Sequence, residues 1–112
     1  TSHLTHKDIS VIELHDCFTI AEILAIEDLE FLKPGTAINK LIKDGDYRKG
    51  LVINPSGGLK ACGHPVGATG IKQIGVISNF LQNSNDKSYG LTQNVGGTGG
   101  TVIVHIIERG NL

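Results

Sequence analysis

The stretch from Asn54 to Gly70 constrains the fold of this chain more than any other part of the sequence. It contains five glycines and two prolines. Glycine adopts backbone conformations that other residues avoid and lets a ligand approach the main chain, while proline fixes its own φ and favours an extended residue before it. The stretch therefore predicts a rigid loop in which His64 is held between Gly63 and Pro65.

A helix is expected directly after this loop. Apolar residues recur there at helical spacing, at Ile71, Ile74, Ile77 and Leu81. The pattern predicts a helix that begins between Gly67 and Gly70, and its N-terminus offers free N–H groups and the positive end of a dipole. The His64 imidazole, the Cys62 thiol and these N–H donors in one rigid loop suit a site that handles a developing negative charge.

Composition narrows the class of protein. The 112 residues fit one domain with a modest core of Ile, Leu and Val, since aromatic residues make up only 4% and Met and Trp are absent. A net charge of −1 with mixed signs gives no basic field, so we expect no nucleic-acid partner. No apolar run approaches the ~20 residues of a membrane span, and the start of the chain lacks a signal pattern, so a cytoplasmic protein is expected. Without a secretory signal, Cys17 and Cys62 are expected to be free or reactive thiols and not a disulfide.

The first part of the chain predicts a strand and a helix. The β-branched run from Val11 to Leu14 is typical of a buried strand. Thr19 and Glu22 form the pattern of a capping box, and Lys33-Pro34-Gly35 is expected to end the helix that follows. The expected apolar face of this helix consists of Ala21, Leu24, Ala25, Leu29 and Leu32, with Glu22, Glu27 and Glu30 directed outward.

The rest of the chain completes a layered α/β pattern. Residues 36–50 predict a surface connection with a short helix and a turn at Asp44-Gly45-Asp46. Residues 51–53 predict a second buried strand, and residues 89–95 and 101–107 predict a hairpin around a glycine-rich loop. The order βαβαββ implies a mixed sheet of about four strands with two main helices, parallel pairs and an antiparallel pair at the C-terminus.

Three loops should meet at one end of this sheet. Functional groups in open α/β sheets gather beyond the carboxyl ends of parallel strands. The loops in question are residues 15–17 after the first strand, 57–64 after the second and 94–97 after the third. The polar residues of these three loops are therefore expected to lie together.

Four motif blocks carry a family resemblance that spans the chain from Val11 to Ile107. They are His15-Asp16-Cys17-Phe18, residues 54–58, Gly63-His64-Pro65-Val66-Gly67-Ala68-Thr69-Gly70 and residues 96–100. In this order and spacing, the blocks resemble the C-terminal part of thiolases, the enzymes that form or cleave β-ketoacyl-CoA. The histidine and cysteine of the first block are most similar to the thiolases associated with sterol carrier protein and their bacterial and archaeal relatives.

The resemblance implies Claisen-type chemistry on coenzyme A thioesters, with no bound cofactor. His64 matches the family histidine that activates the nucleophilic cysteine and helps to bind the thioester oxygen. His15 falls where the family holds a water or polar group for that first oxyanion hole, and Cys17 matches the cysteine proposed as acid/base in this subfamily. Asn94 replaces the usual third cysteine, and Gly96 would still offer its backbone N–H to a second oxyanion hole.

The resemblance also implies that parts of the family's catalytic unit lie upstream of Thr1. These parts are the nucleophilic cysteine, most of the coenzyme A-binding loop, and the first strand and helix of the C-terminal half. Cys62, two residues before His64, does not replace the nucleophile. Residues 1–112 are therefore expected to form one partial domain that is inactive alone and active with the N-terminal half of the same protein in a homo-oligomer. An incomplete sheet is also expected to self-associate through an exposed edge or face.

Each of these residues could also have a purely structural role. His64 could hydrogen-bond only for structure, and His15 could cap the next helix. Cys17 could be a small buried residue, although a place just before a helix favours the thiolate. The glycines at 96–100 could form a simple turn, and Asn54 and Ser56 are expected to shape their loop through local hydrogen bonds. His15, Cys17, Cys62 and His64 are zinc-type donors, but their spacing is not that of a zinc finger, and no metal is expected.

Two alternative functions remain open. The replacement of a family cysteine by Asn94 motivates a thiolase-like protein that binds an acyl-CoA or a partner without thiolase chemistry. A thiolase-like aldolase subunit is the other, and it is less attractive because both histidine motifs are retained. Residues that would bind the coenzyme A moiety itself are not identified by the sequence.

Overall fold

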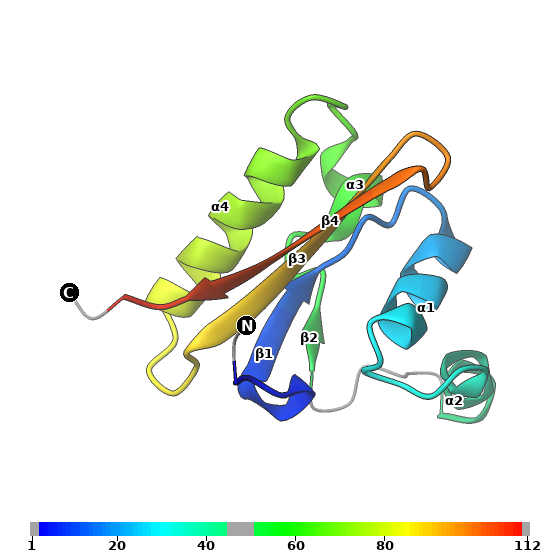
Figure 1. Cartoon of the computed structure of the whole chain (residues 1–112), viewed down its shortest axis with the longest axis horizontal. Coiled ribbons are helices and arrows are strands. Elements are labelled where there is room, and N and C mark those ends of the chain that lie inside the picture. The colour runs from blue at the N-terminus through cyan, green and yellow to red at the C-terminus, as the bar shows by residue number, and fades with distance from the viewer. Residues whose placement is uncertain (1–2, 45–50, 111–112) are drawn as a thin grey trace.

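A four-stranded mixed sheet organises the chain (Figure 1). The structure is a computed structural model that describes residues 3–44 and 51–110. The strands are β1 (Ile9–Glu13), β2 (Val52–Ile53), β3 (Tyr89–Gly96) and β4 (Thr101–Glu108), in the spatial order β2-β1-β3-β4. β1 pairs in parallel with β2 and with β3, and β3 pairs antiparallel with β4. The predicted fold class, the parallel pairs and the C-terminal antiparallel hairpin are therefore confirmed, while the spatial order of the strands was not predicted.

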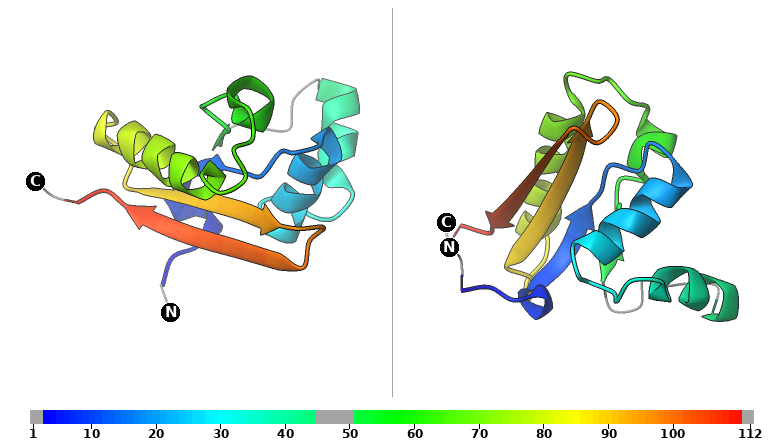
Figure 2. Two further views of the ribbon diagram at one scale, coloured as in Figure 1. Left: turned by 90° about the horizontal axis from the view of Figure 1, so that it is seen from above. Right: turned by 45° about the vertical axis from the view of Figure 1, so that its right-hand side comes forward.

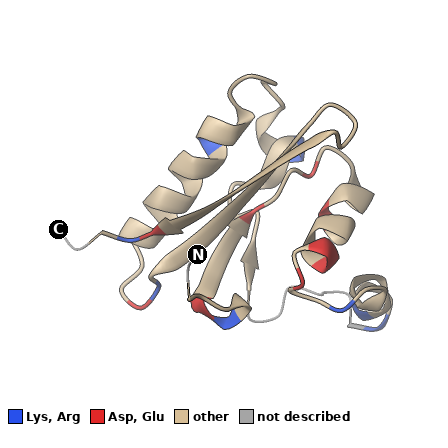
Figure 3. Ribbon diagram, in the orientation of Figure 1, with Lys and Arg blue, Asp and Glu red and all other residues tan. Residues whose placement is uncertain are grey.

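Helices cover both faces of this sheet. A 3₁₀ turn (His6–Asp8) precedes β1, and the helices are α1 (Thr19–Asp28), α2 (Thr36–Asp44), α3 (Gly58–Cys62) and α4 (Thr69–Gln82). Figure 2 shows α4 lying along one face of β3 and β4. Acidic residues lie on α1 and lysines on α2, α3 and α4 (Figure 3). No helix of the described residues is long and apolar enough to cross a membrane.

Two aliphatic clusters hold the layers together. On the α1 face, Ile12 packs with Ile23 and Ile26 of α1, and Ile12 is fully buried. On the α4 face, Val11 packs with Ile77 and Leu81. Successive residues of a strand point to opposite faces, so the adjacent Val11 and Ile12 each supply the centre of one cluster.

The predicted details of α1 are partly wrong. Phe18 occupies the N-cap position without a side-chain cap, so Thr19 and Glu22 do not form a capping box. Leu24 is 51% exposed, whereas Glu22 is buried and accepts a hydrogen bond from Asn54. The helix ends at Asp28, before the predicted stop at Lys33. Apolar periodicity alone could not show that a buried amide would draw Glu22 inward.

The predicted orientation of α4 is also partly wrong. The helix begins at Thr69 as expected, but Ile71 is 74% exposed and Ile74 is 37% exposed. The buried face instead carries Thr69, Gln73, Ile77 and Leu81. The side chain of Gln73 donates hydrogen bonds to backbone carbonyls of β1 and β3. Gln73 therefore lies on the buried face, where the apolar pattern predicted an isoleucine.

Two further expectations concern the connections between the elements. The predicted short helix in residues 36–50 is confirmed as α2, while the turn expected at Asp44-Gly45-Asp46 falls mainly outside the described residues. The stretch that was expected to be a loop contains the short helix α3. β4 is an edge strand with Val102, Ile103, Val104 and Ile106 exposed, and self-association through it stays a prediction.

The closeness of α4 to the sheet gives a testable prediction at Gly90. A Cβ at this position would lie 3.0 Å from Val11 Cγ1, and closer still to Ile77. We expect Gly90→Ala to lower the free energy of unfolding by about 1–3 kcal/mol because the packed layers must move apart. Gly75→Ala on the exposed side of α4 meets nothing within 4 Å and should raise stability by about 0.5–1 kcal/mol. Urea denaturation measures the free energy of unfolding of both variants. An unchanged value in Gly90→Ala would contradict the close packing of α4 on the sheet.

Candidate functional site

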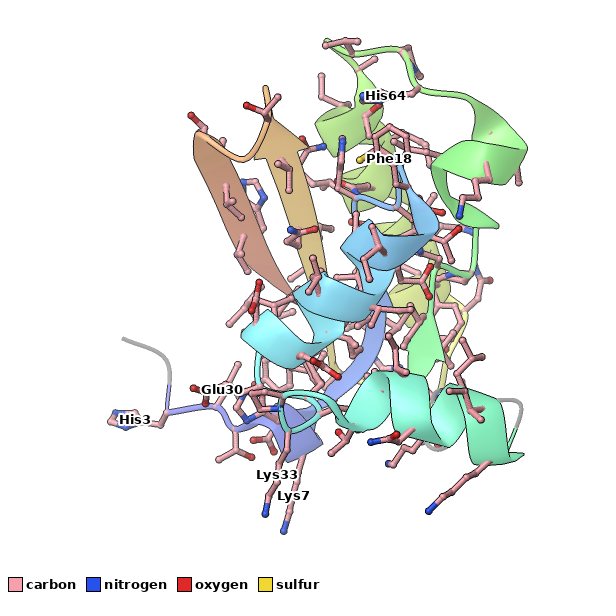
Figure 4. The ribbon with its side chains drawn as sticks, turned by 90° about the vertical axis from the view of Figure 1, so that its right-hand side faces the viewer. His3, Lys7, Phe18, Glu30, Lys33 and His64 are labelled. Carbon is pink, nitrogen blue, oxygen red and sulfur yellow. The ribbon has the colours of Figure 1, made fainter. Side chains whose placement is uncertain are left out.

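The loops that follow the three parallel strands meet at one end of the sheet. Because β1, β2 and β3 run in the same direction, their carboxyl ends lie at the same end of the sheet. Figure 4 shows Phe18 and His64 at this end, whereas His3, Lys7 and Lys33 lie at the opposite end. The convergence expected from the sequence is therefore present in the fold.

A pair of histidines lies at the centre of this end. The rings of His15 and His64 are 4.8 Å apart between centroids and nearly perpendicular, at 80°. His15 is 5% exposed, and its backbone N–H donates to Oε1 of Gln93 at 3.0 Å. The Nδ1 atom of His15 is buried and has no hydrogen-bond partner among the described residues. An unpartnered buried polar atom is costly in a fold and is a reason to expect a ligand or water beside it.

The surroundings of His15 favour its neutral form. Burial lowers the pKa of His15 below the ordinary value of 6.5, and the neighbouring His64 lowers it further. The Asp16 carboxylate acts in the opposite direction but is the smallest of the three influences. A neutral imidazole can donate one hydrogen bond and accept another, so His15 can serve as a donor beside His64.

His64 is oriented by the first turn of α4. Its Nδ1 lies 2.8 Å from Oγ1 of Thr69, and that hydroxyl donates to the carbonyl of Pro65 at 3.1 Å. Since a hydroxyl has one proton and Pro65 receives it, Thr69 must accept the bond from Nδ1–H. This tautomer leaves Nε2 without a proton, which is the form that a general base needs. The imidazole is exposed and can reach a bound molecule.

A buried carboxylate anchors the loop that carries His64. Glu13 is fully buried at the end of β1, where Oε1 accepts the backbone N–H of Ser56 and Oε2 accepts the Ser56 hydroxyl, both at 2.9 Å. Lys72 of α4 donates to the same hydroxyl at 3.0 Å and lies 3.7 Å from Oε2 of Glu13. These contacts join the end of β1, the loop after β2 and the first turns of α4.

A second carboxylate and an amide fasten the same loop. Asp16 accepts the backbone N–H of Leu59 at 2.7 Å, and its carboxylate fills the space that a Cβ at Gly58 would need. Asn54, in the left-handed region with φ 48°, accepts the N–H of Leu14 at 2.7 Å. Asn54 and Ser56 thus shape the loop as expected. The expectation that their bonds are local is wrong, because their main partners lie on and just after β1.

The two cysteines are free and exposed. The alternative that Cys17 is a small buried residue is therefore wrong, and its thiol stands just before α1. Cys62 ends α3 and donates to the carbonyl of Ser56 at 3.2 Å, which fits a structural role. Within residues 3–44 and 51–110, no group of three or more His, Cys, Asp or Glu side chains could hold a metal ion.

The third loop carries Asn94 and Gly96. Nδ2 of Asn94 donates to Oε1 of Gln73 on α4 at 3.1 Å. Gly96 is the last residue of β3 and pairs with Thr101 at the start of β4, so it borders the turn of the hairpin. Both lie at the same end of the sheet as the two histidines.

Sequence reasoning missed several residues that build this site. Glu13, Asp16 and Gln73 are buried and polar, and each links segments that are far apart in the sequence. In the sequence, each of these three could have been noticed as a polar residue inside or next to an apolar run. A buried polar residue needs a partner, and such a residue at the carboxyl end of a parallel strand is a reason to look for one in the next loop.

The chain belongs to the thiolase family, because it matches the family described as Thiolase C-terminal domain-like over residues 1–109. It is 45% identical over 122 residues to a protein named Acetyl-CoA acetyltransferase from Methanocaldococcus jannaschii, in an alignment that covers 96% of this chain. A protein of the same name from Methanothermobacter thermautotrophicus is 46% identical over 95% of the chain. The human protein named Sterol carrier protein 2 is 41% identical over 97% of it.

The matched region is a minor part of these relatives. The alignments cover 30% of each of the two acetyl-CoA acetyltransferases and 21% of human Sterol carrier protein 2. The resemblance inferred from the four motif blocks is thereby confirmed at the level of the family. The roles of individual residues stay predictions.

The lowered pKa of His15 predicts a pH dependence of stability. Since the pKa in the folded protein lies below that in the unfolded chain, the unfolded chain binds more protons. The free energy of unfolding should fall as the pH drops through the ordinary value of 6.5 and should be insensitive to His15 at higher pH. Denaturation of the protein and of His15→Asn over this range should show a shallower fall for the variant. Equal slopes would contradict the assignment.

Proposed function

We propose that this chain is the C-terminal catalytic-loop region of a thiolase-type acetyl-CoA acyltransferase that acts on β-ketoacyl-CoA. The observation that carries the proposal is the perpendicular pair of His15 and His64 at the carboxyl ends of parallel strands. The names of the two archaeal relatives support it. The substrates are coenzyme A thioesters, and the chemistry needs no bound cofactor.

The first half of the reaction uses the two histidines. A cysteine thiol from the N-terminal half of the same protein attacks the thioester carbonyl of an acyl-CoA in condensation, or the β-keto carbonyl of a β-ketoacyl-CoA in thiolysis, and Nε2 of His64 takes the thiol proton. The carbonyl oxygen gains the negative charge, and Nε2–H of His64 and an N–H of neutral His15 stabilise it. Collapse of the intermediate forms an acyl-cysteine and expels either a coenzyme A thiolate or the enolate of an acyl-CoA.

The second half uses the other loops. In condensation, the Cys17 thiolate removes the α-proton of the second thioester, and in thiolysis the Cys17 thiol returns a proton to the enolate. The exposed position of Cys17 before α1 suits this exchange. The backbone N–H of Gly96 stabilises the enolate oxygen, while Asn94 does not titrate and contributes hydrogen bonds alone.

The proposed active unit is larger than these residues. Residues 1–112 form one partial domain, and the nucleophile and the greater part of the coenzyme A site come from the N-terminal half. The active species is a homo-oligomer of the complete protein. The exposed apolar side chains on β4 and α4 fit a domain that is covered by other parts of such an assembly.

Replacement of His64 tests this proposal in the protein that carries both halves. His64→Ala should lower kcat for acetoacetyl-CoA thiolysis by about 10²–10⁴-fold, because both a general base and an oxyanion donor are lost. His3→Ala is the matched control, since His3 is exposed at the opposite end of the sheet (Figure 4) and should leave turnover unchanged. Unchanged turnover in His64→Ala would overturn the role of His64.

A binding protein without thiolase chemistry, or a thiolase-like aldolase subunit, is the second proposal. The binding protein is favoured by one observation, the amide of Asn94 where the family usually has a thiol, while the retained histidine motifs make the aldolase subunit less attractive. Cys17→Ser separates binding from catalysis when coenzyme A thioester binding is measured by calorimetry and turnover by release of acetyl-CoA. The enzyme should keep its affinity within about twofold and lose turnover by about 10²-fold or more. Binding without turnover in the unaltered protein would favour the binding module.

A further inference from the structure

Gln73 is a buried amide that the proposed function leaves without a role. It is fully buried on α4, between Thr69 one turn before it and Ile77 one turn after it. A buried amide is tolerated only when its hydrogen bonds are satisfied. An aliphatic residue would serve the packing of α4 on the sheet at least as well, so the contacts of the amide indicate what it does.

The contacts of Gln73 fix which way its amide points. Nε2 lies 3.1 Å from the carbonyl oxygen of Gln93 and 3.5 Å from that of Glu13. Backbone carbonyls only accept hydrogen bonds, so the NH₂ group must face these two carbonyls on β1 and β3. Oε1 therefore points the other way, toward Asn94.

The orientation of Gln73 in turn fixes the orientation of Asn94. Oε1 of Gln73 can only accept, so the group that faces it at 3.1 Å must be the NH₂ of Asn94. The side-chain oxygen Oδ1 of Asn94 is consequently directed away from Gln73. The two backbone carbonyls thus determine, through one glutamine, which end of a second amide is free.

Asn94 lies close to the part of α4 that orients His64. Its Nδ2 would be 3.5 Å from a Cβ added at Gly70, and Gly70 follows Thr69, the residue that bonds the His64 ring. Two residues one helical turn apart on α4 therefore orient the two side chains: Thr69 orients the imidazole of His64, and Gln73 orients the amide of Asn94. The amide of Asn94 is half-buried and can reach a bound molecule.

We propose that Gln73 is a positioning residue that holds Asn94 with its Oδ1 free to accept a hydrogen bond in the acyl-transfer site. This inference deepens the proposed function and rests on it. Asn94 then supplies a neutral acceptor of fixed direction where the usual family residue is a thiol. The free Oδ1 accepts a bond from a donor of the bound substrate or from a water that contacts it. Gln73 itself does not touch the substrate and acts only through Asn94.

A double-mutant cycle tests the proposal in the protein that carries both halves. Gln73→Leu and Asn94→Ala should each lower kcat for acetoacetyl-CoA by about ten- to a hundredfold, with KM changed by less than about twofold. The double variant should be no slower than the slower single variant, because both remove the same oriented acceptor. Gln82→Leu, at the exposed end of the same helix, is the control and should leave kcat unchanged. Losses that multiply in the double variant would overturn the proposal.

A second variant keeps the test decisive if Gln73→Leu does not fold. Asn94→Asp leaves Gln73 in place and puts a carboxylate oxygen against Oε1, so the orienting hydrogen bond is lost. We expect it to lose as much kcat as Asn94→Ala. An Asn94→Asp protein with the activity of the unaltered one would show that the direction of the amide does not matter, and it would overturn the proposal.

A readout without turnover separates this inference from the function on which it rests. In protein labelled with ¹⁵N-asparagine, the side-chain amide protons of Asn94 should exchange slowly with solvent. Exchange should be at least about tenfold faster in Gln73→Leu and unchanged in Gln82→Leu. An unchanged Asn94 signal in Gln73→Leu would overturn the positioning role. If exchange is faster in Gln73→Leu but the unaltered protein has no acyl-transfer activity, the positioning of Asn94 by Gln73 is supported and the proposed reaction is overturned.

Discussion

The buried carboxylate of Glu13 is the interaction on which the arrangement of the site depends. A carboxylate without partners in the interior costs several kcal/mol, and here it is compensated by two hydrogen bonds from Ser56 and by Lys72. Its partners come from the loop after β2 and from α4, and His64 lies between those two segments in the chain. Since the carboxylate must satisfy both partners at once, the loop has little freedom to place His64 elsewhere. The position of the imidazole is thus a consequence of a charge buried at the end of β1.

The interior is divided by chemistry along the strands. The middle of the sheet is aliphatic on both faces, with Val11 and Ile12 at the centres of the two clusters. At the carboxyl ends polar residues are buried as well, among them Glu13, His15 and Gln73. A core that served stability alone would continue the aliphatic packing to the ends of the strands. The polar end has a stability cost that is repaid only if the groups it holds in place are used, and departures of this kind are expected at functional sites.

The sequence correctly predicted the features of the structure that depend on residues close together in the chain. Strand periodicity, the glycine-rich hairpin and the start of α4 at Thr69 follow from local preferences and are confirmed. The buried face of α4 was predicted only in part: Ile77 and Leu81 are buried as expected, but Gln73 was missed because its amide bonds carbonyls 20 and 60 residues away in the chain. The burial of Glu22 on α1 was also not predicted, because its hydrogen-bond partner Asn54 lies far away in the chain, directly after β2. The convergence of the loops of His15 and His64 was predictable from strand direction, but their perpendicular contact was not.

The lowered pKa of His15 is consistent with the base role proposed for His64. When Nε2 of His64 accepts a proton, the positive charge forms beside a ring whose centroid is 4.8 Å away. A second positive charge at that distance would oppose the proton transfer. Burial lowers the pKa of His15, which favours its neutral form and so weakens this opposition. Asp16 would favour a charged His15, but its carboxylate also accepts the N–H of Leu59 and is the weakest of the three influences. In the proposed reaction the two imidazoles therefore have different roles, with His64 carrying the proton and His15 supplying a neutral donor.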